Sequence, residues 1–114
     1  MLIRKNHSRE KKNSETCTVW EYPLGSKNLG FAIALINGRY PEDGAALNEV
    51  CEVVYYVISG SGIISCDGKP YKLEEGDCFK IEVGNKYWVE GKNLLIAIPT
   101  GPAWYAEQFK HVKE

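Results

Sequence analysis

Residues 53–62, which read Val-Val-Tyr-Tyr-Val-Ile-Ser-Gly-Ser-Gly, decide the fold class of this chain. The first six are β-branched or aromatic, and such residues suit a pleated, buried surface. Gly60 and Gly62 can adopt the positive φ angles that a bulge or a tight reversal needs. A second β-rich run, residues 63–66, follows directly. The stretch therefore predicts a central hairpin in an antiparallel protein.

The bulk composition is that of an ordinary globular domain. The 114 residues carry 14 basic and 15 acidic side chains and a net charge of −1, so no overall charge favours nucleic acid or an anionic membrane as a partner. No apolar run approaches the ~20 residues of a membrane span, and the polar start lacks the features of a signal peptide. We expect a cytoplasmic protein with neither of those partners.

The rest of the chain repeats short β-rich runs separated by polar turns. Turn residues at Asn37-Gly38, Asp67-Gly68 and Gly84-Asn85 separate them. No helical periodicity precedes residue 103, so the rhythm predicts a small barrel or sandwich. The expected strands are Cys17–Tyr22 and residues 29–36, 53–58, 63–66, 71–73, 78–83, 87–90 and 93–98.

The two ends of the chain are expected to be less regular. Residues 1–16 are predicted to be a basic arm, either solvated or docked on a neighbouring subunit, in which residues 1–3 are apolar enough for a short edge strand. Residues 17–114 then form a single domain. Residues 103–113 are expected to form a short helix or an apolar clasp through Trp104, Tyr105 and Phe109.

Four cysteines, Cys17, Cys51, Cys66 and Cys78, are widely spaced, and no pair has the C-x-x-C spacing of a zinc ribbon or a thioredoxin-like site. We interpret them as reduced, buried hydrophobic residues. A thiol cluster assembled from separate strands is the alternative.

Residues 55–62, Tyr-Tyr-Val-Ile-Ser-Gly-Ser-Gly, are similar to the end of the first motif of the cupin superfamily, Tyr-Tyr-Val-Leu-x-Gly-x-Gly. Gly76 and Gly84 match the glycine spacing of the second motif. Residues 100–104, Thr-Gly-Pro-Ala-Trp, resemble the ending of some small cupins. The chain thus resembles the small single-domain conserved-barrel cupins over about residues 30–105. The resemblance implies an all-β, double-stranded β-helix, or jelly-roll barrel, with the C-terminal helix or clasp added.

The metal-binding positions of the family are not matched. Cupins hold their metal with two histidines and a glutamate of the first motif and a histidine of the second. Here the histidine positions fall in residues 46–49, which contain none; Val53 occupies the glutamate position and Tyr87 the second-motif histidine. The resemblance therefore implies neither the usual metal nor another cofactor. A weak oxygen site for a hard cation, made by Glu49, Glu52 and Tyr87, is the alternative.

A barrel of this size encloses a small cavity. Strand alternation predicts an inward face, with Glu49 near the mouth. Trp104 is expected either to cap the mouth or to pack outside against a partner subunit. A carboxylate that faced the interior would need a partner or a shifted pKa, so the directions of Glu49 and Glu52 matter most. Simple packing is the alternative for each inward residue. The inward residues are Val53, Tyr55, Val57, Phe79, Ile81, Tyr87 and Val89, and all but Val53, together with Trp104, are the predicted ligand-binding residues.

Three functions remain open. The first, which we favour, is a metal-free protein that binds a small organic molecule, as a sensor or carrier. The second is a metal-independent isomerase or epimerase on a sugar or related metabolite, rather than a metal-dependent dioxygenase, with Tyr87 as proton donor and Glu49 or Glu52 as base. The third is an interaction module whose barrel is filled by its own side chains. Absence of a barrel histidine counts against catalysis.

A homodimer is expected, because exposed β edges need covering. Residues 1–3 and Cys17–Tyr22 are the candidate edges.

Overall fold

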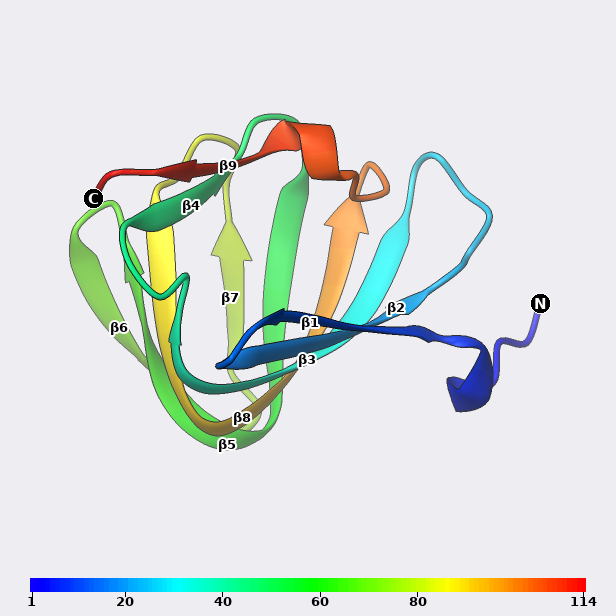
Figure 1. Ribbon diagram of the computed structural model, residues 1–114, viewed down its shortest axis with the longest axis horizontal. Helices are drawn as coiled ribbons and strands as arrows, with labels where there is room; N and C mark the ends of the chain where they lie inside the picture. The colour runs from blue at the N-terminus through cyan, green and yellow to red at the C-terminus, as the bar shows by residue number, and fades with distance from the viewer.

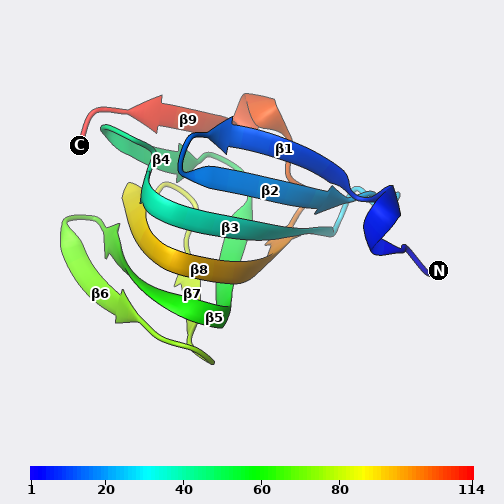
Figure 2. The same ribbon diagram turned by 60° about the horizontal axis from the view of Figure 1, so that its bottom comes forward.

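The computed structural model describes all 114 residues, Met1–Glu114, as a curled antiparallel β-sheet with two short 3₁₀ turns. Figures 1 and 2 show the sheet curling round on itself. The all-β jelly-roll class expected from the sequence is confirmed. No helix is long and apolar enough to cross a membrane. The elements are η1 Lys5–His7, β1 Arg9–Ser14, β2 Cys17–Tyr22, β3 Gly30–Tyr40, β4 Ala45–Asn48, β5 Glu52–Cys66, β6 Lys69–Leu73, β7 Cys78–Ile81, β8 Tyr87–Gly101, η2 Ala106–Gln108 and β9 Phe109–Val112.

The strands follow the order β1-β2-β3-β8-β4-β9, and β5 pairs with β6, β7 and β8. β1, β2, β3 and β8 lie side by side in Figure 2. β5 and β8 are each 15 residues long, and both curve round the base of the molecule in Figure 1. β8 connects the strands β1, β2 and β3 to β5, and β5 in turn carries β6 and β7. These two long strands therefore join the two halves of the barrel.

The hairpin predicted for residues 53–66 is wrong. β5 runs through this stretch as one strand and remains paired to β8, with register shifts on both sides of Ser59. Gly60 has a φ of +81°, which bends the strand at a bulge and does not reverse it. The reversal comes at Asp67-Gly68, between β5 and β6.

Two other expected interruptions are also bends within continuous strands. β3 passes through Asn37-Gly38, where Gly38 has a φ of +113° and the register with β8 shifts. β8 joins the two predicted strands 87–90 and 93–98 through Asn93, whose φ is +48°. A residue with positive φ allows a bulge as readily as a turn, so local composition does not separate the two outcomes.

The first and last strands of the chain, β1 and β9, lie at the two ends of the strand order. Residues 1–3 are not a strand, contrary to expectation, and Met1 and Leu2 are exposed. β1 is the edge strand, because a tight connection places it antiparallel to β2. At the other end β9 pairs with β4, so the C-terminal segment is a clasp that contains one 3₁₀ turn.

The barrel is packed at one end and hollow at the other. The packed end is filled by side chains that are fully buried, each contributing ~1.5–3 kcal/mol relative to an exposed position. None of these residues borders the cavity described below. They include Val57, Ile64, Ile81, Val89 and Leu94.

Candidate ligand-binding site

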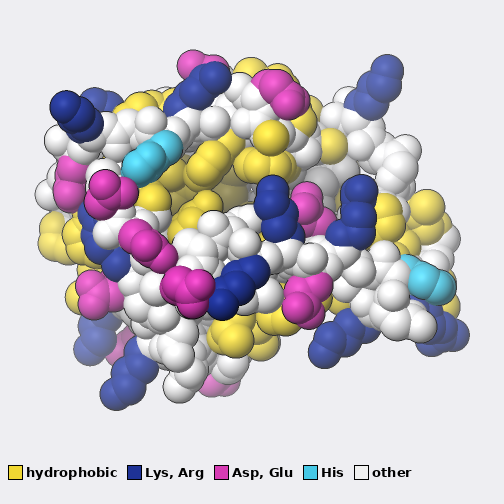
Figure 3. All heavy atoms as spheres, viewed as in Figure 1, with side chains coloured by type: hydrophobic (Ala, Val, Ile, Leu, Met, Phe, Trp, Pro, Cys, Tyr) yellow, Lys and Arg dark blue, Asp and Glu magenta, His cyan; other side chains and the backbone are white.

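The hollow end holds a cavity of about 770 Å³. Figure 3 shows the opening as a hollow lined by hydrophobic side chains on the face seen in Figure 1. Small residues of β3, Ala32 and Ala34, form part of its wall. Their short side chains leave the space that larger residues would fill.

Two buried tyrosines face each other in this wall. Tyr55 of β5 and Tyr87 of β8 meet edge to face, with ring centroids 6.1 Å apart, and neither is more than 4% exposed. Burial raises the pKa of both phenols, and for Tyr55 the nearby Tyr87 adds to the effect. Both hydroxyls therefore remain protonated at neutral pH and can donate hydrogen bonds.

A chain of hydrogen bonds fixes the orientation of Asn48, which also lines the cavity. Gln108 Oε1 accepts hydrogen bonds from the backbone N–H groups of Val50 and Cys51, at 3.2 and 3.1 Å. Gln108 Nε2 must then be the donor in its 2.8 Å contact with Asn48 Oδ1. Asn48 Nδ2 is left as a buried donor that makes no hydrogen bond of normal geometry, although Asn48 is near enough to the Tyr87 hydroxyl to offset part of the rise in its pKa.

A second polar atom of the wall is also unpartnered. Thr100 is 6% exposed, and its Oγ1 has no hydrogen-bond partner. Gly30 lies beside it, and a Cβ there would come within 2.5 Å of Thr100 Oγ1. An unsatisfied buried polar group costs ~1–3 kcal/mol, so two of them mark a place where a bound molecule would be stabilised.

The structure places the predicted inward residues at two heights of the barrel. Val53, Tyr55 and Tyr87 line the cavity, and so does Trp104, which packs on Phe109 with ring centroids 5.7 Å apart. The other four do not line it. Alternation predicts which face of the sheet a residue occupies but not its position along the barrel axis. Those four are Val57, Ile81 and Val89, which are buried in the packed end, and Phe79, which is partly buried there and packs on Tyr71.

Neither glutamate candidate reaches the interior, and the expected place of Glu49 at the mouth is wrong. Both are exposed and lie outside the cavity lining. Glu52 contacts Lys80 at 2.9 Å and Glu49 contacts Lys110 at 3.8 Å. Alternation explains both positions. Glu49 follows the inward-pointing Asn48, and Glu52 precedes the inward-pointing Val53, so each glutamate points outward.

Asn48, Thr100 and Gln108 were not among the predicted site residues. For Asn48 a signal existed, because Ala46 and Asn48 lie two residues apart in the stretch where a cupin has its His-x-His pair. Gln108 gave no local signal, since it reaches Asn48 from 60 positions away.

The positions of the family's metal ligands do come together. Asn48, Val53 and Tyr87 line one cavity, and Ala46 is paired with Tyr87. Nowhere in the structure do three or more His, Cys, Asp or Glu side chains gather as a metal site would need. The four residues at these positions offer an amide, a phenol and two apolar side chains, which do not fit the family's metal.

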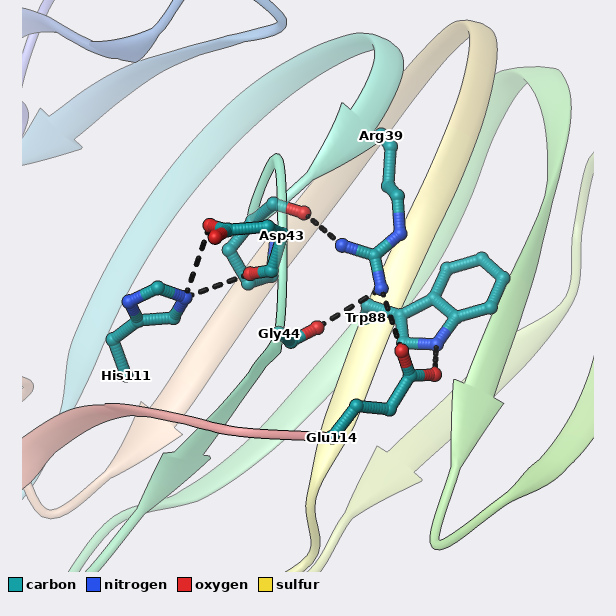
Figure 4. Close-up of polar contacts among 7 residues, drawn as sticks. Arg39, Asp43, Gly44, Trp88, His111 and Glu114 are labelled. Atoms are coloured by element: carbon teal, nitrogen blue, oxygen red, sulfur yellow. Dashed lines mark hydrogen bonds and ion pairs between the residues drawn. The ribbon is translucent and has the colours of Figure 1, made fainter.

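The rim near β4 and β9 is fixed by polar contacts outside the cavity. Arg39 donates to the carbonyl oxygens of Pro41 and Gly44, at 2.6 and 2.9 Å, and pairs with Glu114 at 3.3 Å (Figure 4). Its guanidinium lies 4.5 Å from the centroid of the Trp88 ring. His111 contacts the carbonyl oxygen of Asp43 at 2.7 Å. These contacts join the loop after β3 to the C-terminus.

Comparison with solved structures relates this geometry to known proteins. Pac13, a nucleoside dehydratase, superposes with a TM-score of 0.88 at 14% identity, over 99% of this chain and 91% of that one. KdgF from Halomonas sp. gives 0.74 at 13% identity, over 91% and 94% of the two chains. Ectoine synthase from P. lautus gives 0.69 at 14%, over 89% and 79%.

This chain has a cupin-type fold. At such low identities the likeness concerns the fold alone. No family model and no curated protein matches the sequence. Variants of the Streptomyces Pac13 protein in which a tyrosine or a histidine is replaced, each with uridine, superpose with TM-scores of 0.88 to 0.89.

Proposed function

We propose that this cupin-type barrel binds a small organic molecule without a metal, and that the ligand is a nucleoside or a molecule of similar build. The observation that carries the proposal is a largely apolar cavity whose lining includes two tyrosines and two residues, Asn48 and Thr100, that each hold one buried polar atom without a hydrogen bond.

The chemistry of the lining supports a ligand of this kind. Asn48 Nδ2 requires a hydrogen-bond acceptor, such as a carbonyl oxygen, and Thr100 Oγ1 pairs with either a donor or an acceptor. The rings of Tyr55, Tyr87 and Trp104 offer faces and edges to a planar ring. A pyrimidine nucleoside has the ring, the carbonyl oxygens and the hydroxyls, and it is small enough for a cavity of about 770 Å³.

Uridine is the first probe to use, since Pac13 is described as a nucleoside dehydratase and its variants were studied with uridine. Histidine is absent from the cavity lining here, and the chain's two histidines are His7 and His111. We therefore propose that this chain binds a nucleoside, and we do not propose that it dehydrates one.

Isothermal titration with uridine tests the proposal. Asn48→Leu removes the unpartnered donor and should weaken binding about 10-fold or more, the equivalent of one buried hydrogen bond. Tyr87→Phe should weaken it by less. Tyr56→Phe is the matched control, because Tyr56 is on the same strand as Tyr55 but points outward and is 45% exposed.

A second pair of variants protects the test against misfolding of Asn48→Leu. Thr100→Val keeps the shape of the side chain and removes its hydroxyl, while Thr18→Val makes the same change outside the cavity lining. Uridine affinity that is equal in both, or absence of binding by the unmodified protein at millimolar nucleoside, would refute the proposal.

An enzyme remains the second candidate, because two neutral tyrosines face the cavity and can act as proton donors. The mechanism in which Glu49 or Glu52 acts as the base does not work with this structure, since neither carboxylate lines the cavity. Glu21 is the one carboxylate among the cavity-lining residues. Exchange of a ligand carbon-bound proton with D₂O, followed by NMR and lost in Glu21→Gln, would support catalysis.

The third reading, an interaction module, assumed a barrel filled by its own side chains. The cavity counts against that premise. Binding of a partner at the outer surface is compatible with the proposed function.

A further inference from the structure

The charges at the cavity differ in sign from those of the chain as a whole. Four basic residues and one acidic residue line the cavity, although the chain has a net charge of −1. The acidic residue is Glu21. The basic residues are Arg9, Lys11, Lys12 and Lys27.

β1 supplies three of the four, and its register on β2 accounts for two of them. Alternation places Arg9 and Lys11 on one side of β1, opposite Glu21 and Val19 of β2, which also line the cavity. Glu10 points to the other side and accepts a hydrogen bond from Trp20 Nε1 at 2.9 Å. The edge strand thus turns its carboxylate away from the cavity and two of its cations toward it.

These cations are not neutralised by the protein. Arg9, Lys11 and Lys27 make no ion pair and no side-chain hydrogen bond, whereas Lys12 pairs with Glu15 at 3.2 Å. All four are exposed. Lys27 belongs to the loop between β2 and β3, and its carbonyl oxygen accepts a hydrogen bond from Ala103 N at 3.0 Å, which joins that loop to the segment before Trp104.

The buried wall of the cavity and the exposed cations at its mouth differ in polarity, so together they suit a ligand with two unlike ends. The tyrosines, Asn48 and Thr100 are buried and suit an uncharged ring with polar substituents. The exposed cations suit an anionic group that stays in contact with water at the mouth. An uncharged ligand would leave three cations without a partner beside it.

We propose that the ligand of this barrel carries a negatively charged substituent, a phosphate or a carboxylate, which Arg9, Lys11 and Lys27 contact at the mouth. The inference rests on the proposed nucleoside site and adds the charge of the ligand to it. The shared chemistry is an anionic oxygen group on the sugar end of a ring compound.

Titration of the full-length protein with uridine, uridine 5′-monophosphate and uridine 5′-carboxylate tests the inference and separates the two anions. Either anion should bind about 3- to 30-fold more tightly than uridine, the sum of several exposed charge pairs. The gain should shrink as salt rises from about 0.05 M to about 0.5 M, because exposed charges are screened.

Charge-removing variants locate the effect. Arg9→Gln and Lys11→Gln should each reduce the affinity for the preferred anion by about 2- to 5-fold and leave that for uridine unchanged. Lys86→Gln is the control, because Lys86 is exposed, makes no ion pair and does not line the cavity.

The outcomes separate this inference from the proposed function. Equal affinities for uridine and both anions, or losses in Lys86→Gln as large as in Lys11→Gln, would overturn the anionic substituent and leave nucleoside binding standing. Failure of all three compounds to bind would overturn both.

Discussion

Gln108 Nε2 donates a hydrogen bond to Asn48 Oδ1 at 2.8 Å, across 60 residues of sequence, and neither side chain is more than 2% exposed. The bond joins the last turn, η2, to β4. It also leaves Asn48 with its amino group free, so the C-terminal segment determines what the cavity offers to a ligand.

Replacing Gln108 by alanine should cost both stability and binding. The change removes the acceptor of the Val50 and Cys51 backbone N–H groups and the donor to Asn48 Oδ1. We therefore expect the free energy of unfolding to fall by about 2–4 kcal/mol. Urea denaturation measures it. Glu107→Ala, at the exposed neighbouring position, should change stability by less than about 0.5 kcal/mol. Similar values for the two variants would contradict the role of Gln108.

The sequence was informative about the fold because its signals are local. The β-rich runs and their spacing predicted a small barrel or sandwich, and the resemblance to cupins implied the jelly-roll class. Cys17–Tyr22 is β2 with the same bounds. Gly60 and Gly38 were misjudged because a positive φ serves a bulge and a turn alike, and only pairing with β8 distinguishes them.

The site was less accessible to such reasoning. Tyr55 and Tyr87 could be predicted from motif position and alternation. Gln108 could not, because its partner is distant in sequence. The unpartnered state of Thr100 depends on what surrounds it in three dimensions and leaves no trace in local composition.

Stability should fall at alkaline pH. Burial raises the pKa of the Cys17 thiol from 9.0 to about 12, and burial also raises that of Tyr55. Above pH 9 the unfolded chain releases protons that the folded chain retains, so unfolding becomes more favourable as pH rises. The thiol alone should contribute at most ~1.4 kcal/mol per pH unit between pH 9 and 12. Urea denaturation at several pH values measures the slope.

Cys17→Ala should reduce this dependence between pH 9 and 10, before the tyrosines of the unfolded chain ionise; the pKa values of Cys51 and Cys66 are also raised by burial, so part of it remains. Cys78→Ala, at an exposed position, should leave it as in the unmodified protein. A pH dependence that is unaltered in Cys17→Ala would show that the thiol does not contribute.

Gly60 should not tolerate a side chain. Its φ is +81°, and a Cβ would overlap the backbone oxygen of Asn93 on β8. Gly60→Ala should lower the free energy of unfolding by about 3 kcal/mol or more, because strain and overlap add. Gly68→Ala is a close control: its φ is also +81°, but nothing lies within 4 Å of the added Cβ. It should cost about 1 kcal/mol, and equal losses would exclude the overlap as the cause.

Arg39→Lys should loosen the rim. Lysine keeps the charge but cannot donate in two directions and stack on Trp88 as the guanidinium does. We expect faster hydrogen exchange in residues 41–44 and in β9, with a loss of about 1–2 kcal/mol in global stability. Arg4→Lys, at an exposed position without side-chain contacts, should change neither. Exchange that is unaltered in Arg39→Lys would contradict the role of these contacts.

The homodimer remains a prediction, but its expected interface changes. Residues 1–3 form no strand, and β2 lies between β1 and β3, so neither proposed edge exists. Leu35, Tyr56 and Ile58 are 37–45% exposed on the outer face of β3 and β5, and β8 between them adds Leu95 and Ala97. This uncharged face suits a second copy of the chain.

Light scattering at about 10 µM tests the dimer, because assembly depends on concentration. Leu35→Glu should yield monomers, whereas Ile63→Glu, which changes an exposed isoleucine of β5 outside this face, should not. A monomeric unmodified protein would refute the prediction.

The placement of β1 and β9 at the two ends of the strand order has a kinetic consequence. Each is paired to a single neighbour, and the cavity is bordered by β1 and by Phe109, where β9 begins. Segments held on one side open locally at a smaller free-energy cost than strands held on both. Transient fraying of the first or last strand would therefore widen the mouth of the cavity while β5 and β8 stay paired. Association and release rates would then respond to changes at positions of the end strands that do not line the cavity, such as Glu10, with equilibrium affinity nearly unchanged.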